Sequence, residues 1–218
     1  MSACKHSKPR EWALLPLMAV FVAAGCQAAD ITVQVVDASG APAPDVAVVL
    51  RLTGVTQVPP PLPPVEVVQE KMRFSPAMVV LTPGTRVRFT NRDPWDHHVR
   101  GNGPGSSFEF RVAGTDTPAG AASRAAETVI QAGSGPIQLG CFIHSAMQGN
   151  LYLSESPWYG VTDANGVARI PHVPASAGSL VLWHPMQLVE APATPVRIGT
   201  EDAVLTAALN VKVKRRRG

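Results

Sequence analysis

The chain has 218 residues, enough for one or two small domains, and with 45% hydrophobic and 16% charged residues it can build hydrophobic cores. Frequent valine and the 21 prolines favour β-structure with many turns over helices. The formal net charge of +3 comes from the two ends, because 11 basic and 15 acidic residues remain without residues 1–29 and 212–218. Nucleic-acid binding is therefore not predicted, and residues 213–218 are expected to form a solvated basic tail.

The N-terminus has the layout of a secretory signal. Three basic residues precede the apolar stretch WALLPLMAVFVAAG at 12–25, and small residues follow it. This stretch is too short for a membrane span, so we expect cleavage after Ala28 or Ala29, a periplasmic location and no transmembrane span in the mature chain. The predicted signal peptide is residues 1–29. A second interpretation makes AAGC a lipoprotein signal, with a lipid anchor on Cys26.

Removal of the signal leaves Cys141 as the only cysteine of the folded chain, because Cys4 and Cys26 both precede the cleavage position. An exported protein with one cysteine cannot form an internal disulfide. A free thiol in an oxidising compartment is a chemical liability unless something occupies it. Metal ligation is one way to occupy it.

In chain order, the sequence predicts short strands in three blocks. Residues 30–58 form two strands around the turn-rich DASGAPAPD, and PPPLPP at 59–64 is a stiff connector at a domain boundary. Residues 65–155 contain the alternating strand RVRFTN and the strand, loop and strand of GPIQLGCFIHSAMQGNLYL. Within this block, 101–127 is expected to be mostly loop around a short strand at SFEFRV. Residues 156–212 return to strands, with an Asn-Gly turn between the first two.

Three metal-binding residue types are spaced three apart at Cys141, His144 and Met147. Thiolate, imidazole and thioether together suit copper better than calcium or magnesium, and methionine is a poor zinc ligand. The spacing lets one tight loop direct all three side chains to one centre. A blue-copper site has two histidines, one cysteine and a weak axial methionine, so this loop needs one further histidine. The alternative is a buried thiol beside a chance histidine.

The segment NRDPWDHHVRG offers two candidates for the missing ligand, His97 and His98. If the strand continues through HHV, His97 and Val99 share one face and His98 lies on the other. Valine is the residue expected inside the fold. We therefore assign His97 as the ligand and expect His98 to make a supporting hydrogen bond or to face solvent.

Residues 65–155 resemble a cupredoxin of the plastocyanin and amicyanin type, on the segments LTPGTRVRFTNRD, HHV and GCFIHSAMQG. The resemblance implies a Greek-key sandwich that holds one type 1 copper between two loops at one end. It also implies a structural role for Asn91 and the four metal ligands His97, Cys141, His144 and Met147. Two positions depart from the family pattern. Ile143 replaces a common proline, and His98 replaces an asparagine that ties the two ligand loops together.

The flanking segments look like another family. ITVQVVDASGAPAPDVAVVL and GVTDANGVARIPHVPASAGSLVLW resemble the two parts of one carboxypeptidase-regulatory-like, transthyretin-like sandwich. We therefore predict an all-β fold in which the cupredoxin, 65–155, is inserted into a discontinuous sandwich made of 30–58 plus 156–212. Insertion at a loop is tolerated when the ends of the inserted domain are close together. The alternatives are two sequential small domains or a single enlarged sandwich.

These features predict an exported electron-transfer protein that cycles copper between Cu(II) and Cu(I). The expected partner is a redox protein such as a c-type cytochrome or a dehydrogenase, which would dock on apolar residues around His144. The alternative is a periplasmic copper-binding protein for delivery, storage or sensing. The sequence shows no second metal cluster, nucleophile-base pair or paired carboxylates at diagnostic spacing, so an enzyme is not predicted.

Overall fold

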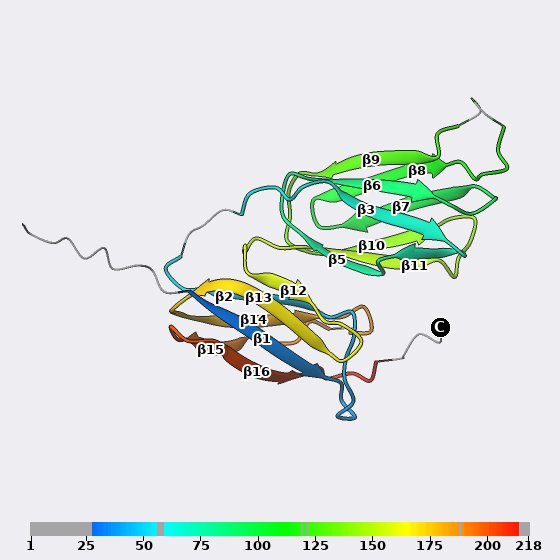
Figure 1. Ribbon diagram of the computed structural model, residues 1–218. Helices are drawn as coiled ribbons and strands as arrows, with labels where there is room; N and C mark the ends of the chain where they lie inside the picture. The colour runs from blue at the N-terminus through cyan, green and yellow to red at the C-terminus, as the bar shows by residue number, and fades with distance from the viewer. Residues whose placement is uncertain (1–27, 56–58, 119, 121, 188, 214–218) are drawn as a thin grey trace, which may run out of the picture.

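The chain is built of strands arranged as two stacked β-sandwiches (Figure 1). The all-β fold class predicted from the sequence is confirmed, because the described residues contain strands, turns and irregular segments but no helix. The computed structural model describes residues 28–55, 59–118, 120, 122–187 and 189–213. The apolar part of the predicted signal, Cys26 and all but the first residue of the predicted basic tail lie outside these ranges.

The outer sandwich combines residues 28–52 with residues 159–208. Its two sheets have the strand orders β13-β1-β16 and β12-β2-β14-β15. The strands are β1 (Ala28–Val36), β2 (Ala47–Leu52), β12 (Tyr159–Val161), β13 (Val167–Pro174), β14 (Ser176–Trp183), β15 (Thr194–Ile198) and β16 (Ala203–Ala208). Strand β1 lies between β13 and β16, so neither part of the chain can complete this sheet alone.

The inserted sandwich is formed by the nine strands between β2 and β12. A five-stranded sheet, β5-β11-β10-β7-β8, faces a four-stranded sheet, β4-β3-β6-β9. The strands are β3 (Val65–Glu70), β4 (Arg73–Ser75), β5 (Met78–Leu81), β6 (Thr85–Asn91), β7 (His97–Gly103), β8 (Ser106–Val112), β9 (Ala125–Ile130), β10 (Gly135–Cys141) and β11 (Gln148–Leu153). Alternating valine and phenylalanine of β6 face the core between the sheets, while its arginines face solvent.

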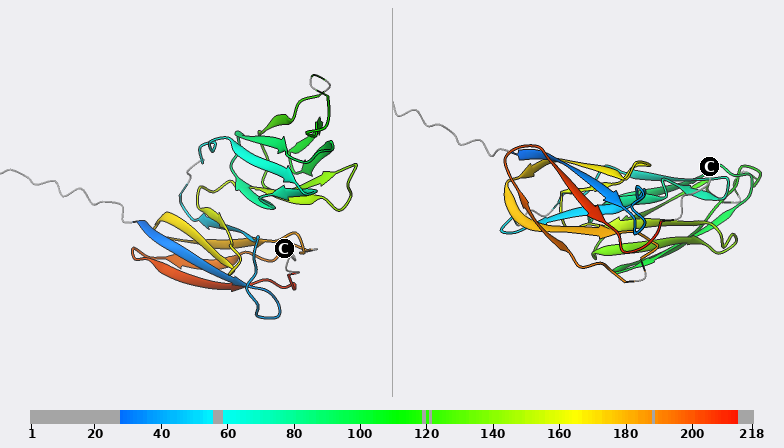
Figure 2. Two further views of the ribbon diagram at one scale, coloured as in Figure 1. Left: turned by 45° about the vertical axis from the view of Figure 1, so that its right-hand side comes forward. Right: turned by 90° about the horizontal axis from the view of Figure 1, so that it is seen from below.

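The two sandwiches, whose stacked arrangement Figure 2 shows, share an apolar interface. Strand β2 is buried on both sides: Val48 and Leu50 face the core of the outer sandwich, whereas Ala47 and Val49 face the inserted sandwich. Across the interface, the rings of Tyr152 and Trp183 lie 5.9 Å apart. Burial on both faces explains why β2 reads as a continuous apolar run and not as an alternating one.

The two predicted cleavage positions, after Ala28 and after Ala29, lie within β1. Ala28 pairs with Pro174, and the fully buried Ala29 pairs with Val173. A cut after Ala28 keeps the buried Ala29 in the strand, whereas a cut after Ala29 removes it. In the part of the chain that the structure describes, no helix is long and apolar enough to cross a membrane.

The region 101–127 contains more strand than its composition indicates. Strands β7 and β8 pair along seven residues each, from His97 opposite Val112 to Gly103 opposite Ser106. The glycines that favour a loop serve packing instead: a Cβ on Gly101 would lie 2.1 Å from the ring of Phe108. The short strand expected at SFEFRV is present as β8. The expectation of loop is wrong for residues 101–103, which continue β7, because glycine in a strand also marks the close approach of a neighbour.

Candidate metal centre

Three side chains with metal-binding atoms meet at one end of the inserted sandwich: those of His97, Cys141 and His144. His97 opens β7 and Cys141 closes the neighbouring antiparallel strand β10, so the ladder itself brings these two residues to the same edge. His144 comes from the loop that joins β10 to β11. The site is therefore built from two strand ends and one short loop.

The loop directs every third residue inward. Cys141 and Met147 are buried and His144 is half-buried, whereas the residues between them are exposed. The amide of Met147 donates a hydrogen bond to the carbonyl of His144, 2.9 Å away, which closes the loop as a tight turn. The Cys-x2-His-x2-Met spacing thus matches the loop positions whose side chains face inward.

The three donor atoms form a compact triangle. The Nδ1 atoms of His97 and His144 are 3.2 Å apart, and each lies 3.8 Å from the Sγ of Cys141. For bonds of about 2.0 Å to nitrogen and about 2.3 Å to sulfur, donors at 120° around one ion would lie about 3.5 Å apart for two nitrogens and about 3.7 Å apart for nitrogen and sulfur. The residues therefore fit a trigonal ion bound by two imidazoles and one thiolate. This donor set suits copper, and zinc also accepts it.

The two adjacent histidines have different surroundings. His97 is fully buried and its Nδ1 joins the cluster. The side chain of His98 turns away, with its Nε2 2.8 Å from the Oε1 of Glu109 and its ring 5.2 Å from that of Phe142. Strand β7 alternates inward and outward at this point, so only one of the two can reach the centre.

The backbone of His98 links the two ligand-bearing segments. Its amide donates to the Sγ of Cys141 at 3.4 Å, and its carbonyl accepts from the amide of Phe142 at 3.1 Å. The resemblance assigned such a link to an asparagine side chain that this chain lacks. Here two backbone hydrogen bonds make the link, so it does not require an asparagine at position 98.

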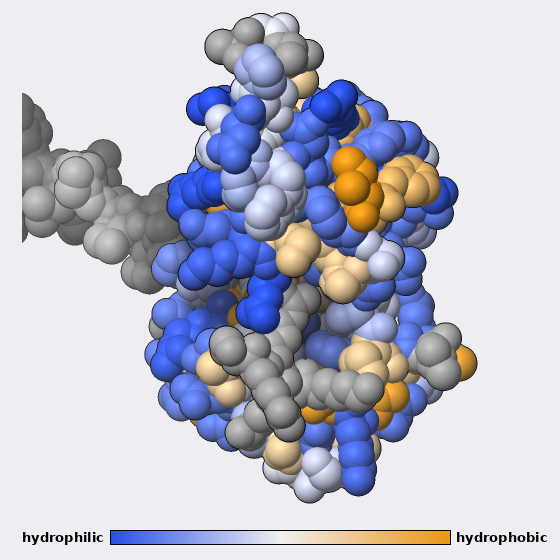
Figure 3. Space-filling model, turned by 90° about the vertical axis from the view of Figure 1, so that its right-hand side faces the viewer, coloured by the Kyte–Doolittle hydropathy of each residue, from blue (hydrophilic) through white to orange (hydrophobic). Residues whose placement is uncertain are grey.

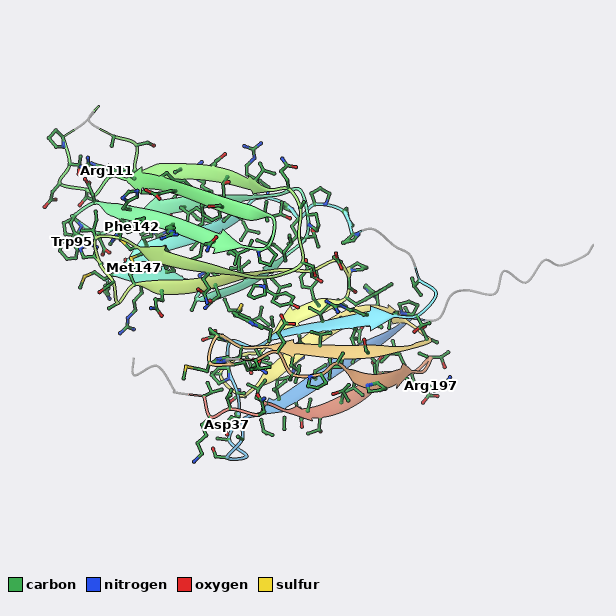
Figure 4. All side chains as sticks on the ribbon, turned by 180° about the vertical axis from the view of Figure 1, so that it is seen from behind. Asp37, Trp95, Arg111, Phe142, Met147 and Arg197 are labelled. Carbon is green, nitrogen blue, oxygen red and sulfur yellow. The ribbon has the colours of Figure 1, made fainter. Side chains whose placement is uncertain are left out.

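Met147 is 1% exposed and packs in the same buried cluster as Cys141. Figure 4 shows it at the same end of the inserted sandwich as Trp95 and Phe142. Met147 therefore lies at the same end of the sandwich as the donor triangle, and its role as an axial ligand stays a prediction.

Asn91 organises the loop before His97, as the sequence interpretation expects. Its Nδ2 donates to the carbonyls of Trp95 and Val112, and its Oδ1 accepts from the amide of Asp93. These bonds fold residues 92–96 into a compact turn. Asn91 therefore shapes the loop and does not belong to the donor triangle.

Asp93 is a site residue that sequence reasoning missed. Its Oδ2 lies 2.8 Å from the Nε2 of His97, on the side of the ring opposite the donor triangle. Burial alone would raise the pKa of this carboxyl group, but hydrogen bonds from the Met72 amide, from His97 and from the Lys71 amide together lower the pKa below its usual value. The carboxyl group is thus held in its charged form.

Apolar side chains surround the outer edge of the site. Phe142 and Ile143 are 55% and 56% exposed, and Trp95 is 44% exposed with its ring 6.3 Å from that of His144. Figure 3 looks onto this end and shows apolar atoms, in orange and tan, gathered among hydrophilic ones. His144 is therefore the donor residue that reaches toward the surface, and it does so inside an apolar rim.

No protein-family model matches this sequence, and no curated protein matches it. Among solved structures, a reduced mutant of amicyanin is similar at 14% identity and a TM-score of 0.34, covering 49% of this chain and 98% of its own. A purple cupredoxin from Nitrosopumilus maritimus is similar at 17% identity and a TM-score of 0.33, covering 41% and 99%. At these identities and TM-scores, the likenesses say nothing about function.

Proposed function

We propose that this protein is an exported electron carrier with a single blue-copper centre held by His97, Cys141, His144 and, axially, Met147. The observation that carries this proposal is the compact triangle of one thiolate and two imidazole donors. When bound there, copper would supply one-electron exchange between Cu(II) and Cu(I). A site that suits both oxidation states similarly keeps the rearrangement between them small.

The arrangement around the donors supports electron exchange through His144. Cys141 and His97 are buried, whereas His144 is half-buried at the surface beside Trp95. The exposed Phe142 and Ile143 offer a small apolar surface, of the kind expected for brief encounters between redox proteins. We propose that a redox protein such as a c-type cytochrome or a dehydrogenase docks there. The protein would act as a carrier and not as an enzyme.

The proposed location is the periplasm, after cleavage of the signal or lipidation of Cys26. Ala29 is fully buried in β1, so a cut after Ala28 leaves this buried residue in the mature chain. The mass of the exported protein discriminates the two routes, because a lipid on Cys26 adds several hundred daltons and retains residues 26–28.

Voltammetry of the copper-loaded protein tests the electron-carrier proposal. We expect a reversible one-electron wave and retention of the metal in both oxidation states, because Cys141 and His97 are buried at the ends of two paired strands. A protein that binds only Cu(I), without colour, and loses it rapidly to a chelator would contradict the proposal and favour delivery or storage. A variant with Ile143→Ala is the control, since it changes the exposed rim and no donor.

A further inference from the structure

The buried ring of His97 lies between the donor triangle and a carboxylate. Its Nδ1 faces Cys141 and His144, and its Nε2 lies 2.8 Å from the Oδ2 of Asp93. His97 is 0% and Asp93 is 4% exposed. The contact is therefore shielded from solvent. In such an environment a charge acts more strongly than it does in water.

The carboxylate of Asp93 is fixed by a turn from the other sheet. The amide of Lys71 donates to its Oδ1 at 2.5 Å and the amide of Met72 donates to its Oδ2 at 2.9 Å. Lys71 and Met72 form the two-residue turn between β3 and β4, and both have positive φ values, 54° and 55°. Such turns favour Asn-Gly, so two residues with long side chains hold an unfavourable backbone conformation here. This conformation points both amides at one carboxyl group.

These contacts require a hydrogen on the Nε2 of His97. Backbone amides can only donate, so both oxygens of Asp93 act as acceptors. A carboxylate accepts from His97 only if the imidazole carries its hydrogen on Nε2. In the neutral imidazole, the lone pair is then on Nδ1, directed at the triangle.

We propose that Asp93 is a positioning residue that holds His97 in the Nε2–H tautomer and whose buried negative charge favours Cu(II) over Cu(I) at the centre. The proposal rests on the proposed copper function. Its two parts have separate causes, because the tautomer follows from the hydrogen bond and the redox preference follows from the charge. A carboxylate that only braced the loop would fix neither the tautomer nor the redox preference.

Within the described ranges, the carboxylate of Asp93 contacts the donor triangle only through His97. Among the described residues, Asp93 contacts two backbone amides and one imidazole, and no lysine or arginine side chain pairs with it. Its charge is therefore not neutralised by a cation within the protein. A neighbouring negative charge would stabilise Cu(II) more than Cu(I), because Cu(II) carries the higher positive charge.

The variant Asp93→Asn tests the redox part, because it removes the charge at nearly constant size. We expect Cu(II) affinity to fall about 10- to 100-fold, as is usual for partners of metal-bound histidines. The ratio of Cu(II) to Cu(I) affinity should fall about tenfold, which equals an upward shift of about 59 mV in a one-electron potential. An unchanged potential in a copper-loaded Asp93→Asn protein would overturn this part.

Glu109→Gln is the matched control. It removes the carboxylate that lies 2.8 Å from the Nε2 of His98. His98 follows His97 in β7 and faces outward, and Glu109 lies on the neighbouring strand β8. Glu109 is half-exposed, so solvent and salt screen its charge. We expect a change of less than about twofold in the affinity ratio. An equal shift in both variants would mean that any nearby carboxylate has this effect, and would overturn the assignment to Asp93.

The tautomer is measured without metal, on the wild-type protein, by nitrogen NMR of the histidine rings. We expect a hydrogen on Nε2 of His97 and none on Nδ1, with slow exchange because the ring is buried. A hydrogen on Nδ1 would overturn the proposal even if Asp93→Asn failed to fold. If the wild-type protein instead shows the Nε2–H tautomer but takes up no copper, the proposed function fails while the positioning role stands.

Discussion

Replacing His97 with alanine should weaken Cu(II) binding by more than about a hundredfold, whereas His98→Ala should change it by less than about threefold. Loss of a hydrogen-bond partner of a metal-bound histidine typically lowers metal affinity about 10- to 100-fold. Loss of the ligand itself should therefore lower the affinity more. His97 contributes one of the three atoms of the donor triangle. The side chain of His98 points to Glu109, and its contacts with Cys141 and Phe142 through the backbone survive the substitution.

Competition with a chelator of known Cu(II) affinity measures both variants on one scale. Circular dichroism is the control, because both substituted proteins must retain the β-sheet signal of the wild type. Loss of binding in His98→Ala with retention in His97→Ala would show that the wrong histidine has been placed in the centre. Equal losses in the two variants would also contradict the assignment.

Replacing Phe89 with alanine should lower the free energy of unfolding of the inserted sandwich by about 3 to 5 kcal/mol. Phe89 lies in β6 with 0% of its surface exposed. Its ring centroid is 6.5, 5.8 and 5.3 Å from those of Phe74, Phe108 and Phe110. The substitution leaves a space at the centre of this aromatic group, which the surrounding sheets can fill only in part.

Unfolding in urea, followed by fluorescence and circular dichroism, gives the change in stability. Ile143→Ala is the control, since its side chain is 56% exposed and surface substitutions usually stay within about 0.5 kcal/mol. A loss below about 1 kcal/mol in Phe89→Ala would show that this aromatic group is not the core of the sandwich.

The local features of the metal site can be read from the sequence. Cys141, His144 and Met147 are spaced so that one turn can bury all three, and the structure has the inward orientation at each third residue. The choice of His97 over His98 uses only the two-residue period of a strand. Both arguments depend on neighbouring residues in the chain, where spacing and geometry are tightly linked.

Asp93 was missed because its role depends on residues distant in sequence. NRDPWDHH contains two aspartates before the histidines, and nothing in the segment distinguishes Asp93 from Asp96. In the structure, Asp96 binds Arg111, Gly114 and Thr117, whereas Asp93 receives the amides of the β3–β4 turn and His97. That turn lies more than twenty residues earlier and carries no glycine or asparagine to signal its conformation.

The interface between the sandwiches is another feature that the sequence indicates only in part. An apolar run such as the one in β2 is compatible with any strand that is covered on both faces. The partners that cover Ala47 and Val49 lie on β5 and β11, which belong to the inserted sandwich. Pairing these surfaces requires the three-dimensional arrangement of both sandwiches.

The visible spectrum of the exported protein with one equivalent of Cu(II) tests the central claim most directly. A thiolate bound to Cu(II) in a trigonal site with two imidazoles should give an intense blue absorption that saturates at one copper per chain. The absorption should be absent in Cys141→Ser, which replaces the thiolate sulfur by a hydroxyl oxygen at almost the same position. A wild-type protein that stays colourless with Cu(II), or an absorption that persists in Cys141→Ser, would contradict a copper centre built on Cys141.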